Sequence, residues 1–298
     1  MKANRTMALT ALGAAVVLGT AGYLTSGGKE KEEIERTESV VDISRAAEDG
    51  HLRLPVEAYL PDKAQRELLR RARQKAVEQC MKDKGFSCRA PSATSLPDDS
   101  TGNLTDGRYG IHDRAKAAKF GYHPDPKLQE QRAKVMDASS KSLTGSSERE
   151  RRALMGSAPA KNDGCIQEVK QRFAGASAQN SPAMKIANQA YDQAKADRRV
   201  KHAFSGWEAC MRHQGYSYGE PMQANDDSKF ATRSPTEQEI QVAVTDVDCR
   251  LQNEVNKIWY QTENEYQKRL IGKNSGELET ARRDVARSLS EARSLAKG

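Results

Sequence analysis

Apolar residues recur at every third or fourth position along most of the chain beyond residue 61, and polar residues fill the positions between them. That spacing matches the 3.6-residue period of an amphipathic helix with one buried face. Asp62 can cap the first such run, and Gln65 stands three places on to complete the cap. The apolar face of this run is formed by Leu68, Leu69, Ala72, Ala76 and Cys80. We predict a helix that begins after Pro61 and carries Cys80 on its buried side.

The pattern E-x-C-M-x-x-x-G-[F/Y]-S occurs twice, with its cysteines at Cys80 and Cys210. Its glycine is Gly85 in the first copy and Gly215 in the second. Glycine commonly ends a helix because it adopts a left-handed backbone conformation without strain. Both copies are therefore predicted to be helix ends, with the aromatic residue after the glycine folded back on the last turn.

Further helices and loops are predicted between and beyond the two copies. Helices are expected at 113–119, at 147–155, from Cys165, from Pro182 with a break at Asp197, and from there to Gly215. The segments 87–127 and 138–147 are rich in residues typical of turns, and we predict loops there, apart from the short helix at 113–119.

The longest hydrophobic stripe lies between Ile240 and Leu270 and extends over about thirty residues without a lapse. The stripe includes Val244, Val247, Leu251, Val255 and Ile258. Val242, Ala243 and Cys249 lie off the stripe, so its first turns are expected to be enclosed on two sides. A final helix is predicted to reach about residue 296. Together these patterns predict an all-α, disulfide-stapled helical domain with long loops and a long C-terminal helix.

The first 56 residues differ from the rest. Residues 1–28 have a positive start and an uncharged apolar run from Ala8 to Leu24, which is typical of an export signal. A cleaved signal peptide and a retained membrane anchor both fit a run of this length. Residues 29–56 are charged and predict a flexible linker, so the helical extracytoplasmic domain is expected at 57–298.

Composition limits the partners and the size of the core. Hydrophobic residues make up 37% of the chain and aromatic residues 5%, against 30% charged residues, which favours slender helices that need covalent staples. The net charge of +7 falls to +5 when Lys2 and Arg5 of the leader are set aside. No basic block interleaved with aromatic residues is present, so we expect no nucleic-acid partner.

The five cysteines are Cys80, Cys88, Cys165, Cys210 and Cys249. Each copy of the repeat is followed by a single helix-borne cysteine, so we predict that Cys80 pairs with Cys165 and Cys210 with Cys249. The enclosed loops contain 84 and 38 residues. Their closure contributes at most about 4 to 5 kcal/mol each in the chain-entropy model. A local bridge between Cys80 and Cys88 is the rival pairing.

The candidate binding residues lie within residues 107–125, which we call the excursion. They are Tyr109, His112, Asp113, Tyr122 and His123, and two aromatic-glycine pairs indicate an ordered segment. A groove for a glycan or a peptide could be lined by aromatic residues, namely Tyr109, Tyr122, Trp207, Tyr216 and Tyr218. His112, Asp113, His123 and Asp125 could also form a metal site with oxygen and nitrogen ligands. Their spacing matches no standard ligand motif, and a helix capped by Asp113 with exposed imidazoles explains them as well. We assign no metal and no cofactor.

Catalytic signatures are absent from the sequence. It contains no G-x-S-x-G elbow, no H-E-x-x-H, no phosphate loop and no C-x-x-C. Cys88 has no histidine nearby in the sequence and is a poor candidate nucleophile. No catalytic residue is assigned, and an enzyme is the less favoured interpretation.

The order of several short motifs is similar to that of uncharacterised exported proteins of actinobacteria. The motifs are C-M-x-x-x-G-F, R-Y-G-I-x-D with F-G-Y-H, G-C-x-x-E, W-x-x-C-M-x-x-x-G-Y-x-Y-x-x-P and D-V-x-C-R before a long terminal helix. The resemblance covers residues 57 to about 296, and Cys88 departs from it. It implies an extracytoplasmic protein that carries a signal or a lipid anchor. The cysteine needed for lipid attachment is missing here.

The leading functional hypothesis is an extracytoplasmic binding or accessory protein of the cell envelope. Its partner would be an envelope protein or a cell-wall polymer, and residues 8–24 would attach it to the membrane if they are retained. The alternatives are an enzyme that acts on envelope polymers, with the excursion as its cleft, and a metal or redox sensor that uses Cys88.

Overall fold

The computed structural model describes residues 52–87, 104, 107–144, 147–157, 163–179 and 181–297. The chain separates into two units, residues 1–41 and 42–298, and every described residue belongs to the second unit. The predicted leader at 1–28, most of the predicted linker at 29–56, and Cys88 lie outside the described residues. Within the described ranges the chain forms helices and their connections, and no strand is present.

The predicted all-α fold is confirmed. Its elements, with η for a short 3-10 helix, are η1 (Pro55–Tyr59), α3 (Lys63–Asp83), α4 (Arg114–Phe120), α5 (Pro126–Thr144), α6 (Glu148–Met155), α7 (Cys165–Arg172), η3 (Ala174–Ala176), α8 (Pro182–Ala196), α9 (Arg198–His213), α10 (Pro221–Asn225), η4 (Ser228–Phe230), α11 (Glu237–Gln252), α12 (Val255–Lys273) and α13 (Ser275–Lys297). Among the described helices, none is long and apolar enough to cross a membrane.

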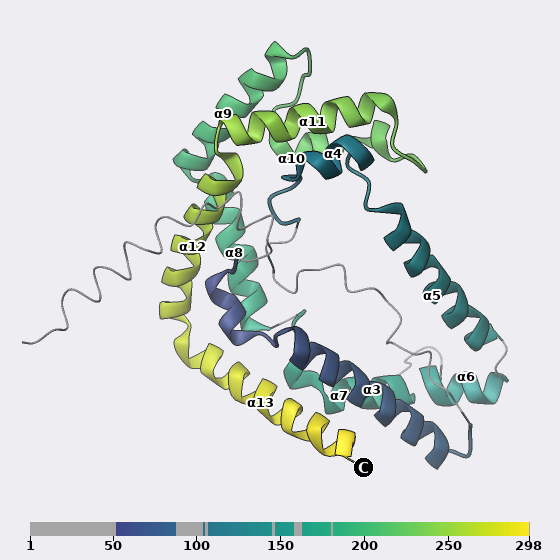
Figure 1. Cartoon of the computed structure of the whole chain (residues 1–298). Helices are drawn as coiled ribbons and strands as arrows, with labels where there is room; N and C mark the ends of the chain where they lie inside the picture. Colours follow the sequence, from purple (N-terminus) through teal and green to yellow (C-terminus); the bar gives the residue numbers. More distant parts are fainter. Residues whose placement is uncertain are drawn as a thin grey trace, which may run out of the picture. The chain divides into compact units, whose positions relative to one another are not determined.

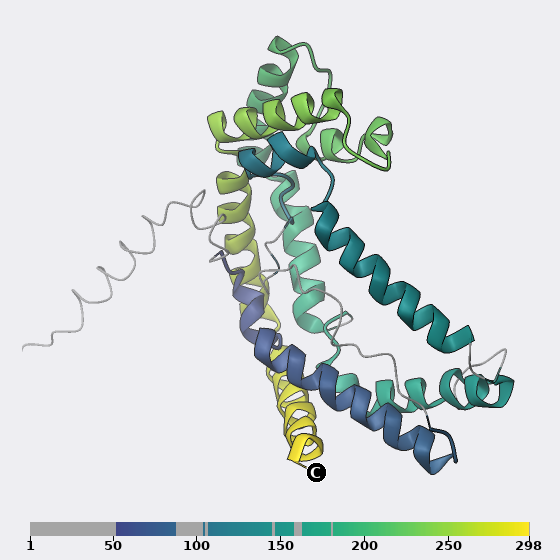
Figure 2. The same cartoon turned by 45° about the vertical axis from the view of Figure 1, so that its right-hand side comes forward.

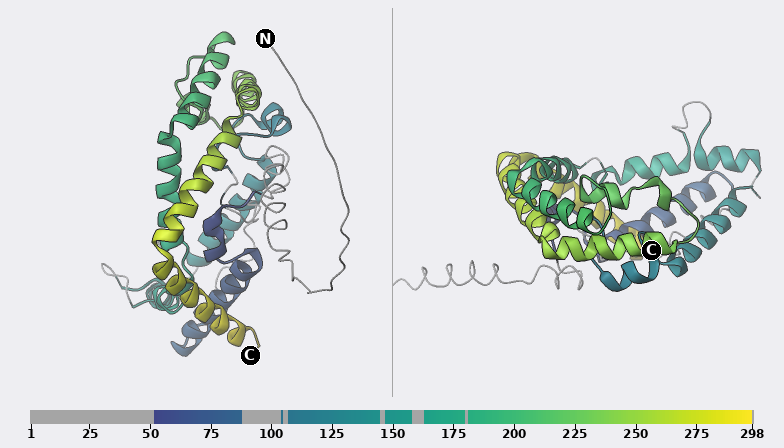
Figure 3. Two further views of the ribbon diagram at one scale, coloured as in Figure 1. Left: turned by 90° about the vertical axis from the view of Figure 1, so that its left-hand side faces the viewer. Right: turned by 90° about the horizontal axis from the view of Figure 1, so that it is seen from above.

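Three groups of helices pack side by side. α8 lies along α12, α13 packs against α3, and α4 packs against α11 (Figures 1 and 2). α9 follows α8 with a break at Asp197 and also packs against α12 (Figure 3). The largest apolar cluster lies between α9, α11 and α12. Its members include Phe204, Trp207, Met211, Val242, Val255 and Trp259.

The two copies of the repeat have the same local structure. In the first, the Phe86 N–H donates to the Met81 carbonyl at 2.9 Å and the Gly85 N–H to the Lys82 carbonyl at 2.9 Å. The second copy repeats both bonds, from Tyr216 and Gly215, at 2.9 and 3.0 Å. Gly85 has φ 83° and Gly215 has φ 88°, so each helix ends in the glycine-dependent Schellman arrangement. The repeat is a pair of helix ends, as predicted.

Both predicted disulfides are present. Cys80 is bonded to Cys165 with 5.8 Å between the Cα atoms, and Cys210 is bonded to Cys249 with 5.7 Å. These separations lie in the usual range for disulfides. The first bond joins α3 to α7, and the second joins α9 to α11. The rival bridge from Cys80 to Cys88 is therefore wrong.

Several boundaries differ from the sequence predictions. α5 extends through Thr144, so the loop predicted at 138–147 is largely helical. The stripe from Ile240 to Leu270 does not lie on one helix, because Glu254 has φ 47° and separates α11 from α12. Leu251, three residues before this break, is 49% exposed, whereas Val242, Ala243 and Cys249 are buried as predicted.

The helical unit also begins earlier than the predicted boundary at residue 57. Leu52, Leu54 and Val56 are buried, and the Val56 N–H donates to the Gln267 side chain at 3.1 Å. Residues 52–56 therefore belong to the packed unit, although the sequence pattern predicts that they are part of the linker. Their alternating apolar side chains contact the unit directly. The residues before them are highly charged, so this short apolar alternation is difficult to recognise in the sequence.

Candidate functional site

The start of the excursion is held on α12 by a buried carboxylate. Arg108 donates from Nε and Nη2 to the carboxylate oxygens of Glu263 at 2.8–3.1 Å, and the Tyr109 hydroxyl donates to it at 2.8 Å. The Gln267 amide is the third donor side chain, and its Nε2 donates to Glu263 Oε1 at 2.7 Å. Glu263 is fully buried, and burial raises the pKa of the Tyr109 phenol well above its ordinary value. The charge of Arg108 and the hydrogen bonds from these side chains reduce the free-energy cost of burying the Glu263 carboxylate.

The middle of the excursion is held by a second buried ion pair on α11. Arg250 donates to Asp246 at 2.6 Å and to the Tyr109 carbonyl at 2.6 Å. Asp246 also accepts from the Trp207 indole at 2.8 Å and from the Tyr122 hydroxyl at 3.0 Å. Arg250 is 2% exposed and Asp246 is fully buried. Burial, and secondarily the nearby Asp246 charge, raise the pKa of Tyr122.

The two aromatic-glycine pairs explain how the backbone approaches α11 so closely. Gly110 has φ 82°, and a Cβ there would lie 2.9 Å from Arg250 Nη2. Gly121 has φ 59°, and a Cβ there would lie 2.5 Å from Glu239 Oε1. Only glycine fits both the left-handed conformation and the close approach. The motifs R-Y-G and F-G-Y-H are therefore docking motifs for the charged side chains of α11 and α12.

The end of the excursion is held by His123. Its Nδ1 lies 2.7 Å from Glu239 Oε1, and its Nε2 lies 2.8 Å from the Thr232 carbonyl. Glu239 is fully buried, and its Oε1 also accepts the Tyr122 N–H at 2.8 Å. The His123 side chain is only 12% exposed. The expectation of exposed imidazoles is therefore wrong for His123.

His112 and Asp113 have different surroundings. The Asp113 side chain caps α4 by accepting the Lys116 N–H at 2.9 Å, as the capped-helix interpretation predicts. His112 is half-buried, and its Nδ1 is 3.4 Å from the Gly110 carbonyl. Of the five predicted binding residues, Tyr109, Tyr122 and His123 direct their polar atoms into buried contacts with α11 and α12. The binding role stays a prediction, and the excursion has a clear structural role.

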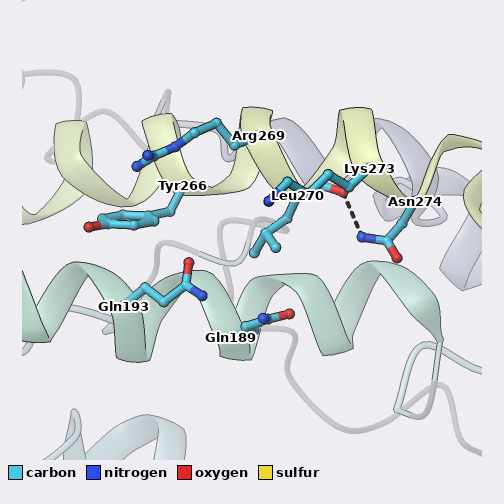
Figure 4. Close-up of a pocket in the computed structure, with 7 residues that line it drawn as sticks. All are labelled: Gln189, Gln193, Tyr266, Arg269, Leu270, Lys273 and Asn274. Carbon is cyan, nitrogen blue, oxygen red and sulfur yellow. Dashed lines mark hydrogen bonds between the residues drawn. The ribbon is translucent and has the colours of Figure 1, made fainter.

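A pocket of about 390 Å³ lies between α8 and α12 (Figure 4). Its lining is formed by Gln189, Gln193, Tyr266, Arg269, Leu270, Lys273 and Asn274, whose polar groups stand among a larger share of apolar side-chain surface. Figure 4 shows the two glutamines on α8 facing the α12 side chains, with Tyr266 at one end and Asn274 at the other. The alanine stripe of α8, which includes Ala187 and Ala190, is buried and allows the helices to pack closely. We call this pocket the groove.

Positive charge is held in place along the groove. The Arg269 guanidinium lies 4.3 Å from the centre of the Tyr266 ring, a cation–π contact. The Tyr266 hydroxyl donates to Asp197 at 3.1 Å. Arg199 hydrogen-bonds to that carboxyl and lowers the pKa of Asp197 to about 2. No carboxylate belongs to the lining, so Arg269 and Lys273 give the groove a cationic character.

The sequence held only a faint signal for the groove. Gln189 and Gln193 are four residues apart, as are Arg269 and Lys273, so each pair lies on one helix face. The pairing of these two faces depends on the antiparallel packing of helices that are about seventy residues apart in the chain, a relation that hydrophobic periodicity does not encode.

The described residues contain no cluster of three or more His, Cys, Asp or Glu side chains that could hold a metal ion. No family model, no curated protein and no solved structure matches this chain.

Proposed function

We propose that the helical unit is an extracytoplasmic binding protein of the cell envelope and that the groove holds anionic groups of a cell-wall polymer. The observation that carries this proposal is the lining of the groove. Arg269 and Lys273 supply cationic donors on α12, and amide side chains on α8 supply neutral ones. Donors of both kinds suit carboxylate and phosphate oxygens, which repeat along an anionic polymer.

The two disulfides support a location outside the cytoplasm, because such bonds persist in oxidising compartments. In this proposal residues 8–24 direct the chain to the membrane, where they are either removed or retained as an anchor. The buried contacts of the excursion would then serve as a rigid support for α12. A preformed site loses less entropy when it binds its ligand.

The test is binding of the full-length protein to isolated cell-wall fragments, with Arg269→Gln/Lys273→Gln as the variant. Losing two charge-assisted hydrogen bonds costs about 1.5 kcal/mol or more, so we expect the affinity to fall about tenfold or more. Wall fragments stripped of phosphate-containing polymers would show whether phosphate or carboxylate is the bound group.

The matched control is Lys201→Gln/Lys268→Gln, which removes the same charge from exposed positions outside the groove lining. It should stay within about twofold of the wild-type affinity, since exposed charges that do not contact the ligand act only through screened long-range attraction. Equal losses in the two double variants, or no loss in either, would contradict the proposal.

A further inference from the structure

The contacts of His123 and Glu239 determine how many protons the two side chains hold together. The Thr232 carbonyl can only accept, so His123 Nε2, at 2.8 Å from it, carries a hydrogen. The 2.7 Å contact between Nδ1 and Glu239 Oε1 then needs a second proton, since a ring lone pair facing a carboxylate oxygen would be repulsive. Ring and carboxyl together hold two protons in this arrangement, whichever atom of the Nδ1–Oε1 pair carries the shared one.

The surroundings of Glu239 make the loss of the shared proton energetically costly. Glu239 is fully buried, and its Oε2 is buried without a hydrogen-bond partner in the structure. From α11 the group that faces the ring is the Glu239 carboxyl, and from the segment after η4 it is the Thr232 carbonyl. Asp246 and Arg250, further along α11, face Tyr122 and each other. Losing the shared proton would leave a buried carboxylate without a counter-charge, which is strongly unfavourable.

We propose that His123 and Glu239 form a pH-sensitive clamp that fastens the end of the excursion to α11 and opens as the pH rises above neutrality. α5 begins at Pro126, three residues beyond His123, so the clamp is the point at which the chain leaves α11 towards α5. The other anchors of the excursion involve Arg108 and Arg250, and arginine does not lose its proton in this range. Opening of the clamp therefore breaks only the contact at His123. It releases the N-terminal end of α5 from α11, while Tyr109 keeps its contacts with α11 and α12.

The direction of the pH effect follows from the clamp contacts. The hydrogen bond to the Thr232 carbonyl, and then the Glu239 carboxyl, raise the pKa of His123 in spite of its burial. A raised pKa stabilises the closed form fully below the ordinary histidine pKa of about 6.5. That stabilisation is lost as the pH rises through the folded-state pKa. Between the two values the opening equilibrium should rise by up to about tenfold per pH unit.

The test is hydrogen exchange of the full chain between pH 5.5 and 9, corrected for the intrinsic pH dependence of exchange. We expect the Tyr122 amide, which donates to Glu239, to lose protection with rising pH, whereas the amides near Arg250 on α11 keep theirs. His123→Gln should abolish this pH dependence, because the replacement does not titrate. The matched control is His112→Gln, which removes the half-buried imidazole of the same excursion and should leave the pH dependence intact.

A second measurement keeps the inference testable if His123→Gln fails to dock. Nitrogen-15 NMR of the wild-type ring should show a hydrogen on Nε2 throughout and a titration of the Nδ1 site in the same pH range as the loss of Tyr122 protection. Protection of Tyr122 that is constant from pH 5.5 to 9, or an opening that follows His112, would overturn the clamp.

Discussion

The two disulfide-stapled helix ends differ in their surroundings. At the first, Met81 packs in a small cluster with Leu154 and Cys165. At the second, Met211 belongs to the largest cluster, together with Trp207 and Trp259. The backbone hydrogen bonds at the two ends are the same, and both methionines are fully buried. The first end thus depends chiefly on its disulfide, and the second has a large core beside it.

The second region is also held by buried charges. α11 carries Cys249 of the disulfide and, one position later, Arg250, which contacts Asp246 and the excursion backbone. At the first region one polar contact near the disulfide is the exposed hydrogen bond from the Lys84 ammonium to the Asp163 carbonyl at 3.2 Å. Identical local motifs can therefore have different structural roles, because a disulfide adds to whatever packing surrounds it.

Removing the first disulfide should have the largest effect on stability. Cys80→Ala/Cys165→Ala opens a loop whose ends are 85 positions apart, for which the chain-entropy model assigns between about 4 and 5 kcal/mol. Denaturant unfolding measures this loss as a lower midpoint. A decrease of less than about 1 kcal/mol in the free energy of unfolding would show that the small cluster around Met81 stabilises this region without the disulfide.

Removing the second disulfide should cost slightly less. Cys210→Ala/Cys249→Ala opens a loop whose ends are 39 positions apart, a closure worth about 4 kcal/mol in the same model. The measurement is the same, and the unfolding of the first variant is its reference. A second variant that is clearly less stable than the first would reverse the comparison between the regions.

Breaking the buried ion pair tests what distinguishes the second region. Arg250→Met leaves Asp246 buried without its counter-charge and should lower the free energy of unfolding by about 3 to 5 kcal/mol. The control is Arg114→Met, which breaks an exposed pair with Asp248 and should cost less than about 1 kcal/mol. Similar losses in the free energy of unfolding for the two variants would mean that burial does not determine the cost of breaking these ion pairs.

The smallest effects are expected at the glycines that end the two helices. Gly85→Ala and Gly215→Ala place a side chain at φ 83° and φ 88°, where each costs about 1 to 2 kcal/mol, and neither Cβ would meet a neighbour within 4 Å. The two costs should agree, since both arise in the backbone. Thermal unfolding of the two variants checks this, and unequal costs would show that the surroundings affect even the local motif.

Local features of the fold could be predicted from the sequence. The Asp62 cap with Gln65, the helix ends at Gly85 and Gly215, and the break at Asp197 each depend on residues within one helical turn. The disulfide pairing followed from comparing the two copies of the repeat. Such signals are short-range or internal to the sequence, so propensity and periodicity reveal them.

Long-range polar contacts could not be predicted in the same way. Arg108 and Glu263 are 155 positions apart, and nothing near either residue identifies its partner. The same holds for His123 and Glu239, which are 116 positions apart. Polar residues in an apparently exposed excursion therefore suggested a binding site, whereas their partners are buried charges on α11 and α12.

Native-state hydrogen exchange of the two disulfide-deletion variants tests the comparison most directly. In Cys80→Ala/Cys165→Ala, amides in the last turns of α3 and in α7 should exchange at least about tenfold faster than global unfolding alone allows, because the small cluster cannot hold them. In Cys210→Ala/Cys249→Ala, amides of α9 and α11 should exchange only through global unfolding. Local opening of α9 and α11 equal to that of α3 and α7 would contradict the account.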